Sequence, residues 1–143
     1  MRKLLVFLTL GALVCALTAA GAPAATTATS SWASDANQVC VVWLAKAKKE
    51  FGNPVTPSQL YSFAVKAKKL EAQELAVLKK IPNRTAAGTH ALAAVQTDVT
   101  EVGAAISAYQ AGNASRFIAI LKRYLNDNRP KVAFAAAGAA QCG

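Results

Sequence analysis

The stretch from Thr56 to Pro82 constrains the fold more than any other part of the sequence. It opens with Thr56-Pro57-Ser58-Gln59, in which the threonine can cap the first turn, the proline suits the first helical position and the glutamine can complete a capping box. Apolar side chains then recur at the spacing of one helical face: Leu60, Phe63, Ala64, Ala67, Leu70, Leu75, Leu78 and Ile81. Pro82 ends the helix, and the apolar stripe requires other helices to cover it.

Two glutamates, Glu71 and Glu74, fall inside this stripe, one turn apart. An unpaired buried carboxylate is costly and tends to take up a proton. The favoured interpretation is that both glutamates pair with cations of the last helix, near Arg129 and Lys131. One alternative is an interior polar site for a metal or a small ligand, because helical bundles hold carboxylate sites in their cores. Another is exposure at the edge of the stripe.

The next helix offers few further ligands for such a site. Asp98 lies at the edge of its apolar face, Glu101 lies further round, and His90 lies on nearly the opposite side. No histidine is therefore in register to complete a Glu-x-x-His arrangement. We predict no metal site and no cofactor. A carboxylate pair for glycan cleavage is weaker still, because such pairs face each other across a cleft.

Three more segments have helical periodicity. The first runs from about Asp35 to Phe51 and places Cys40, Trp43, Leu44, Ala47 and Phe51 on one face. Another is expected from about Thr85 to Ala111, where the Ala-Gly-Asn sequence favours a break. The last begins with Asn113 as its cap and reaches Gly138.

Pro130 lies inside this last helix and removes one hydrogen bond from its ladder. We expect a kink near Asn126 rather than a break that restarts at Lys131. Four helices joined by short loops predict an all-α, antiparallel up-down-up-down four-helix bundle. This topology brings the start of the first helix to the end of the fourth, so Cys40 and Cys142 should meet.

The N-terminal 24 residues have the features of a secretory signal peptide. A positive Met1-Arg2-Lys3 end precedes an apolar run, and Ala22-Pro23-Ala24 fits a cleavage site, with cleavage after Ala20 as the next choice. A retained membrane anchor is the rival interpretation. Lipid attachment at Cys15 is disfavoured because the preceding Val14 is not small. We therefore predict a secreted or cell-envelope protein with a flexible segment over 25–34 and one helical domain over 35–143.

Export also decides the role of the cysteines. In an oxidising compartment, Cys40 and Cys142 are best interpreted as one disulfide that closes a loop of about 100 residues. A redox or metal pair is the alternative. The chain has no Cys-x-x-Cys motif and no histidine near these cysteines, which argues against that alternative.

Short motifs are similar to those of a group of small exported actinobacterial proteins. They are an Asp-Ala-x-x-x-Cys start at Asp35, a Leu-x-x-Ile-Pro helix end at Pro82, an Ala-Gly-Asn break at Ala111, and a Gly-x-x-x-Cys-Gly end at Gly138. Many members of that group are lipoproteins, and the group has no established activity. The resemblance implies a helical, disulfide-tied envelope protein.

The chain carries 16 Lys+Arg against seven Asp+Glu, and its net charge is +9. Its basic residues recur in groups, and a solvated helix face is the simple explanation. The alternative is an anion-binding surface for wall polymers, acidic lipids or nucleic acid, attracted without regard to sequence. The possible anion-binding residues are Lys46, Lys48, Lys49, Lys66, Lys68, Lys69, Lys79, Lys80 and Arg84.

These patterns exclude more functions than they identify. A protein that recognises a base sequence would bring arginine, asparagine or aromatic side chains to its surface, whereas this surface is mainly lysine. No motif orders a nucleophile with a base, so we predict no catalytic residues and no enzyme. A membrane-surface helix is not expected, because the apolar faces are needed for the core. The leading hypothesis is a non-enzymatic binding protein that contacts anionic polymers, and the alternative is a small-ligand or metal carrier built on Glu71 and Glu74.

Overall fold

The computed structural model describes residues 31–54 and 56–142, which fold into five α-helices and one short 3-10 helix with no strand among them. The predicted all-α fold is confirmed. The predicted signal peptide and residues 25–30 lie outside the described residues. No helix in the described ranges is long and apolar enough to cross a membrane. The elements are α1 (Trp32–Glu50), α2 (Pro57–Leu78), α3 (Ala86–Gln110), α4 (Ala114–Leu125), α5 (Arg129–Ala136) and η1 (Ala140–Cys142).

The helix ends follow the predicted capping chemistry. Thr56 and Gln59 form a complete capping box at the start of α2, since each side chain accepts a hydrogen bond from the other residue's backbone N–H. Asn113 caps α4 by accepting from the N–H of Arg116. Gly112 follows α3 with a positive φ of 74°, a conformation that glycine adopts without strain.

The helix α1 starts earlier than the sequence predicted. Ser31 caps it, so residues 31–34, which we assigned to a flexible segment, belong to the folded domain. Trp32 is only 2% exposed and stacks on Phe134 at 6.4 Å between ring centroids. A Cβ on Gly88 would lie 2.9 Å from the Trp32 ring, so only glycine leaves room for the tryptophan there.

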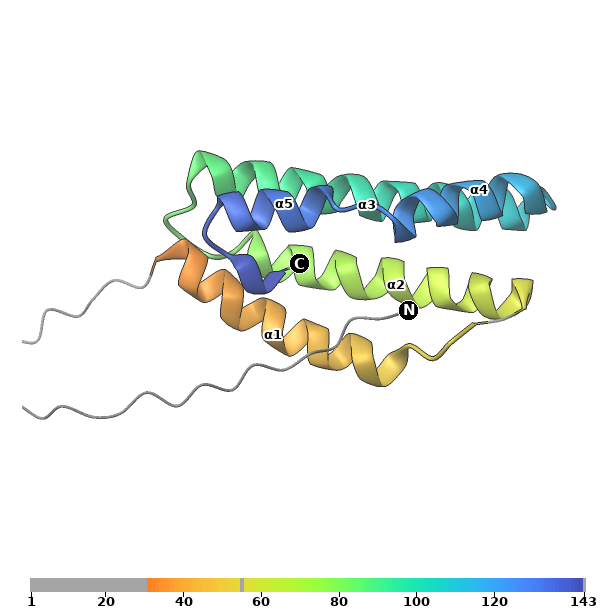
Figure 1. Cartoon of the computed structure of the whole chain (residues 1–143), viewed down its shortest axis with the longest axis horizontal. Helices are drawn as coiled ribbons and strands as arrows, with labels where there is room; N and C mark the ends of the chain where they lie inside the picture. Colours follow the sequence, from red (N-terminus) through yellow and green to blue (C-terminus); the bar gives the residue numbers. More distant parts are fainter. Residues whose placement is uncertain (1–30, 55, 143) are drawn as a thin grey trace, which may run out of the picture.

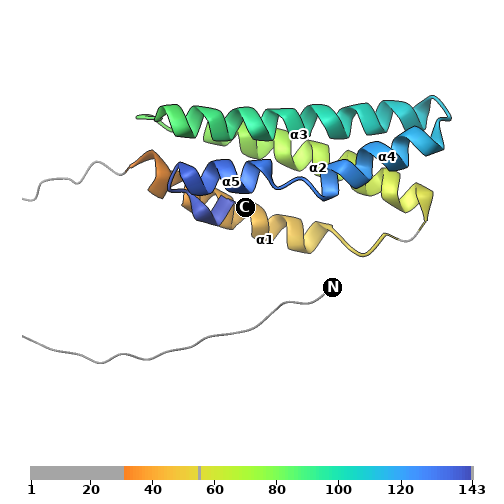
Figure 2. The ribbon, with the colours of Figure 1, turned by 45° about the horizontal axis from the view of Figure 1, so that its top comes forward.

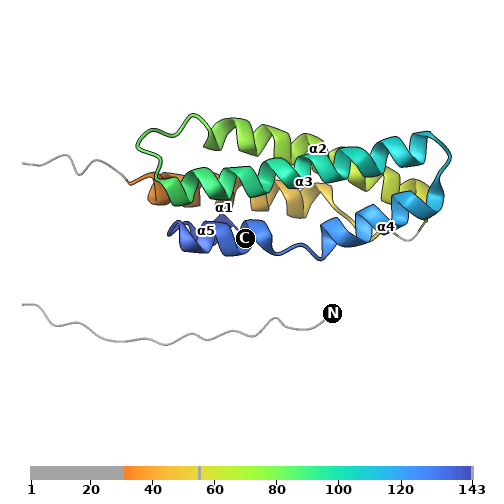
Figure 3. The ribbon, with the colours of Figure 1, turned by 90° about the horizontal axis from the view of Figure 1, so that it is seen from above.

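The expected kink near Asn126 is wrong, because the helix breaks. α4 ends at Leu125, and α5 restarts at Arg129 with Pro130 in its first turn. Proline is well placed there, since the first turn has no intrahelical acceptor for its missing N–H. In Figures 2 and 3, α4 and α5 follow each other along α3, separated by this irregular connection.

The interior contains two separate apolar clusters. The disulfide-end core is built by α1, α2, α3, α5 and η1, and its buried residues are Trp32, Ala36, Cys40, Leu75, Leu78, Ala91, Leu92, Val95, Ala133, Phe134 and Ala139. The far-end core is built by α2, α3 and α4, and its buried residues are Ala64, Val102, Ala105, Ala108, Phe117, Ile120 and Leu121. The helix α1 contributes to the disulfide-end core alone.

A disulfide joins Cys40 to Cys142, as predicted. Cys40 lies in the middle of α1 and is 1% exposed. The bond therefore fastens η1 across α1, and the Asn37 side chain supports it by accepting a hydrogen bond from the N–H of Gln141. Figures 1 and 2 show the C-terminal segment lying beside α1, and η1 contacts α1 and α5.

Candidate functional site

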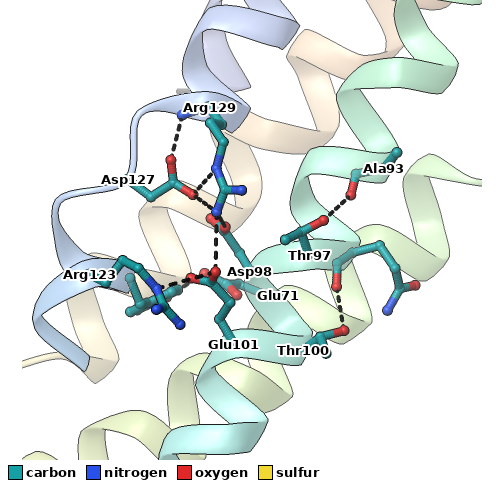
Figure 4. Close-up of polar contacts among 11 residues, drawn as sticks. Glu71, Ala93, Thr97, Asp98, Thr100, Glu101, Arg123, Asp127 and Arg129 are labelled. Atoms are coloured by element: carbon teal, nitrogen blue, oxygen red, sulfur yellow. Dashed lines mark hydrogen bonds and ion pairs between the residues drawn. The ribbon is translucent and has the colours of Figure 1, made fainter. Parts of the chain in front are cut away.

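Five carboxylates gather between the two apolar cores. Glu71 and Glu74 come from α2, Asp98 and Glu101 from α3, and Asp127 from the break between α4 and α5. We call this group the carboxylate layer, and Figure 4 labels its members other than Glu74. The whole chain has only seven Asp+Glu. Most of its negative charge is therefore inside, and the exterior is more cationic than the composition suggests.

Two arginines reach the carboxylate layer from outside. The Arg129 guanidinium donates to Asp127 with Nε 2.6 Å from Oδ2, and its Nη2 lies 3.4 Å from Oε1 of Glu101 and 4.0 Å from Oδ1 of Asp98. Arg123 lies 3.4 Å from the same Glu101 oxygen. Arg129 thus binds three of the carboxylates, and Figure 4 shows its side chain pointing into the group.

The prediction that Glu71 and Glu74 pair with cations is wrong. No ion pair within residues 31–54 and 56–142 involves either of them, because Arg129 pairs with the carboxylates on α3 and Asp127. Glu71 instead accepts a hydrogen bond from the Tyr124 hydroxyl. Burial raises the pKa of Glu71, although the tyrosine hydrogen bond opposes the rise. Burial and the neighbouring Glu71 charge raise the pKa of Glu74 to about 7.

Asp98 and Asp127 have pKa values shifted in opposite directions. Asp98 is 7% exposed, and its burial, followed by its hydrogen bond and repulsion with Asp127, raises its pKa to about 7. The hydrogen bond from Arg129 lowers the pKa of Asp127 to about 2. At neutral pH, Asp127 is therefore ionised and pairs with Arg129. The protonated and ionised forms of Asp98 are both populated at that pH.

Three carboxylates of the layer are close enough together to bind a cation, and the guanidinium of Arg129 already pairs with them. Asp98, Glu101 and Asp127 each offer one oxygen, and these oxygens lie within 4.8 Å of one another. A surface hollow of ≈ 680 Å³ borders the group at Glu101, Asp127 and Arg129. Arg129 approaches all three carboxylates, so a metal ion entering there would have to displace it or face its charge.

The predicted anion-binding lysines, unlike the carboxylates of the layer, lie exposed on the surface. All nine predicted anion-binding residues are exposed, and within the described part of the chain no lysine forms an ion pair with a carboxylate. Three of the nine bind uncharged groups: Lys46 lies 3.8 Å above the Trp43 ring, Lys79 donates to Gln96 at 3.0 Å, and Arg84 donates to the backbone carbonyl of Lys79. Their positive charge is therefore not neutralised within the protein.

Sequence reasoning considered four of the five members of the carboxylate layer. It identified Glu71 and Glu74 as polar interruptions of an apolar stripe, and it placed Asp98 at the edge of the next apolar face and Glu101 further round. It gave neither Asp127 nor Tyr124 a role in this site. The available signal was the Asn126-Asp127-Asn128 sequence before Pro130, which is typical of a loop and not of a helix.

No protein-family model, curated protein or solved structure matches this chain. Similarity to known proteins therefore adds no residue role to the geometry above. The function must be argued from the distribution of charge and from the exposed side chains.

Proposed function

We propose that this protein is a secreted or cell-envelope binding module, not an enzyme, whose lysine-rich exterior contacts anionic polymers. Its framework in this proposal is an antiparallel up-down-up-down bundle in which α4 and α5 together make the fourth helix. The alternating course of the ribbon in Figure 1 supports that topology.

One observation carries the proposal: the two kinds of charge are separated. Five of the seven Asp+Glu side chains form the carboxylate layer, and two arginines pair with three of them, Asp98, Glu101 and Asp127. The lysines outside keep their charge for a partner, because no carboxylate in the described part of the chain pairs with them. Such a surface attracts a polyanion through long-range charge and without base or sugar recognition.

Retention on an immobilised polyphosphate, measured at increasing salt, tests the proposal. We expect retention that falls steeply with salt, because screening weakens attraction between exposed charges. The combined variant Lys66→Gln, Lys68→Gln and Lys69→Gln should elute at lower salt, whereas the control Glu50→Gln should elute at the same or higher salt. Weak retention that salt does not change would overturn the proposal.

A cation carrier is the second candidate, and the specific observation in its favour is the close approach of the Asp98, Glu101 and Asp127 oxygens. Metal analysis and native mass spectrometry of the mature protein test it. A stoichiometric ion that Asp98→Asn abolishes would support this function. A metal-free protein that binds neither Ca²⁺ nor Mn²⁺ would end it.

A further inference from the structure

The second half of α1 presents aliphatic side chains to solvent. Leu44, which the sequence placed in the core, is 43% exposed, and Val41 and Val42 are 53% and 54% exposed. Beyond Cys40, the residues of α1 that turn inward are Trp43 and Ala47. In Figures 1 and 2, the α1 ribbon slants away from α2 toward its C-terminal end. This half of the helix therefore has a partner on one face only.

The exposed residues form one continuous strip along the helix. Val41 lies three and four residues before Leu44 and Ala45, which places the three side chains next to one another. Lys48 and Lys49 continue the same face into the last turn, and both are exposed. We call this strip, made of Val41, Val42, Leu44, Ala45, Lys48 and Lys49, the α1 outer face.

The charge of the α1 outer face decides which partner fits it. A second copy of the chain would add its own Lys48 and Lys49 to the contact, and this face holds no carboxylate to pair with them, so the net charge opposes that contact. An anionic polymer would satisfy the lysines and leave the aliphatic side chains in water. A bilayer containing anionic lipids satisfies both, because its headgroups attract lysine and its outer acyl region accepts valine and leucine.

We infer that the α1 outer face is a docking surface for an anionic lipid bilayer. This inference rests on the proposed function, in which the lysine-rich exterior binds anionic partners, and it names an anionic lipid surface as the partner of α1. The helix α1 lies along the membrane surface with Val41, Val42 and Leu44 among the headgroups, while the Cys40–Cys142 disulfide holds it on the bundle. Lys46, packed on Trp43, flanks the contact.

Co-sedimentation of the mature protein with phosphatidylglycerol vesicles and with phosphatidylcholine vesicles tests the inference. We expect binding to the anionic vesicles alone. The combined variant Val41→Asn and Leu44→Gln should bind about tenfold more weakly, since it removes apolar area from the contact. Lys48→Gln and Lys49→Gln should each weaken binding about fivefold. All four side chains are exposed, so a thermal melt should show these variants folded.

Matched controls separate a local contact from a general effect. Val132→Asn changes an aliphatic side chain that is 60% exposed on α5, and Lys131→Gln removes one charge from the same helix. Both controls should bind vesicles like the unmodified protein. Equal losses for controls and α1 variants, or no vesicle binding, would overturn the inference. If the protein binds soluble polyphosphate but not vesicles, only this inference fails; if it binds neither, the proposed function fails as well.

Discussion

The disulfide-end core and the far-end core are built from the same helices α2 and α3 but are completed in different ways. At the disulfide end, α1, α5 and η1 close around Trp32 and Phe134, and a covalent bond fixes them. At the far end, α4 alone covers α2 and α3, with stacked Tyr61 and Tyr109 and an edge contact to Phe117. The comparison shows that no buried residue of the far-end core comes from α1. The second half of α1 packs inward through Trp43, and Phe51 at its end contacts Phe63, so only its outer side is left available for a partner.

The carboxylate layer separates these two cores, and the break between α4 and α5 lies beside it. A continuous helix would carry position 127 on a regular helical turn. The break instead presents Asp127 to Arg129 and to the carboxylates of α3. The connection therefore supplies Asp127, and α5 begins with Arg129, which pairs with Asp127 and with Glu101 on α3.

Loss of the disulfide should have the largest effect and should act on one core. The double variant Cys40→Ala and Cys142→Ala should lose about 4–5 kcal/mol of unfolding free energy, since the bond closes a loop of about 100 residues. Denaturant unfolding measures this loss, and amide exchange locates it. Exchange should accelerate in α1, α5 and η1 more than in α4. Uniform acceleration would contradict two separate cores.

The buried phenylalanines test whether the two cores are independent. Phe134 and Phe117 are 1% and 0% exposed, so Phe134→Ala and Phe117→Ala should each cost about 3–5 kcal/mol. Because the carboxylate layer lies between them, the double variant should equal the two single losses within about 0.5 kcal/mol. A coupling energy well above that value would show one continuous core.

Removing a carboxylate from the layer should stabilise the protein at high pH. The pKa of Glu74 is about 7 in the folded protein against 4.5 as the ordinary value, so its share of stability is fully present below pH 4.5 and is lost as the pH rises to about 7. Glu74→Gln should abolish this loss and raise the unfolding free energy at pH 8 by up to about 3 kcal/mol. Urea unfolding at pH 4 and pH 8 measures the difference. Glu50→Gln removes an exposed carboxylate and is the control, and a gain at pH 8 as large as that of Glu74→Gln would refute the assignment.

The smallest effect expected is from Arg129→Lys. Lysine keeps the charge but cannot donate to Asp127 and Glu101 at the same time with a planar group. Because Arg129 is half exposed and solvent screens its ion pairs, the loss of unfolding free energy should be smaller than for any variant above, measured by denaturant unfolding near neutral pH. Arg116→Lys, on the exposed first turn of α4, is the control and should cost nothing measurable. A loss of similar size in the control would show that the effect does not come from the contacts of Arg129 with Asp127 and Glu101.

Local sequence chemistry accounts for what could be predicted of the fold. The capping box at Thr56, the turn at Gly112 and the apolar stripe of α2 act within a few residues of each other, so their structure is visible in the sequence. The disulfide could be predicted because the expected bundle topology and the expected export both favoured it. Trp32 could not be placed, because its burial depends on Gly88 and Phe134, which are distant in the sequence.

The candidate site was harder to predict because side-chain pairing depends on exact register. Arg129 was expected at the level of Glu71 and Glu74, but a helix break moved Asp127 beside it and changed its partners. Leu44 matched the buried face by spacing, yet it is exposed because α1 diverges from α2. Periodicity gives the face of a helix but not whether a neighbour covers it.

Carbon-detected NMR titration of the carboxyl groups, from pH 2 to pH 9, tests the separation of charge most directly. The account predicts that Glu74 and Asp98 titrate near pH 7 and Asp127 near pH 2. If Glu74 and Asp98 titrated near pH 4, as they would in water, the carboxylate layer would not be buried and the account would be contradicted.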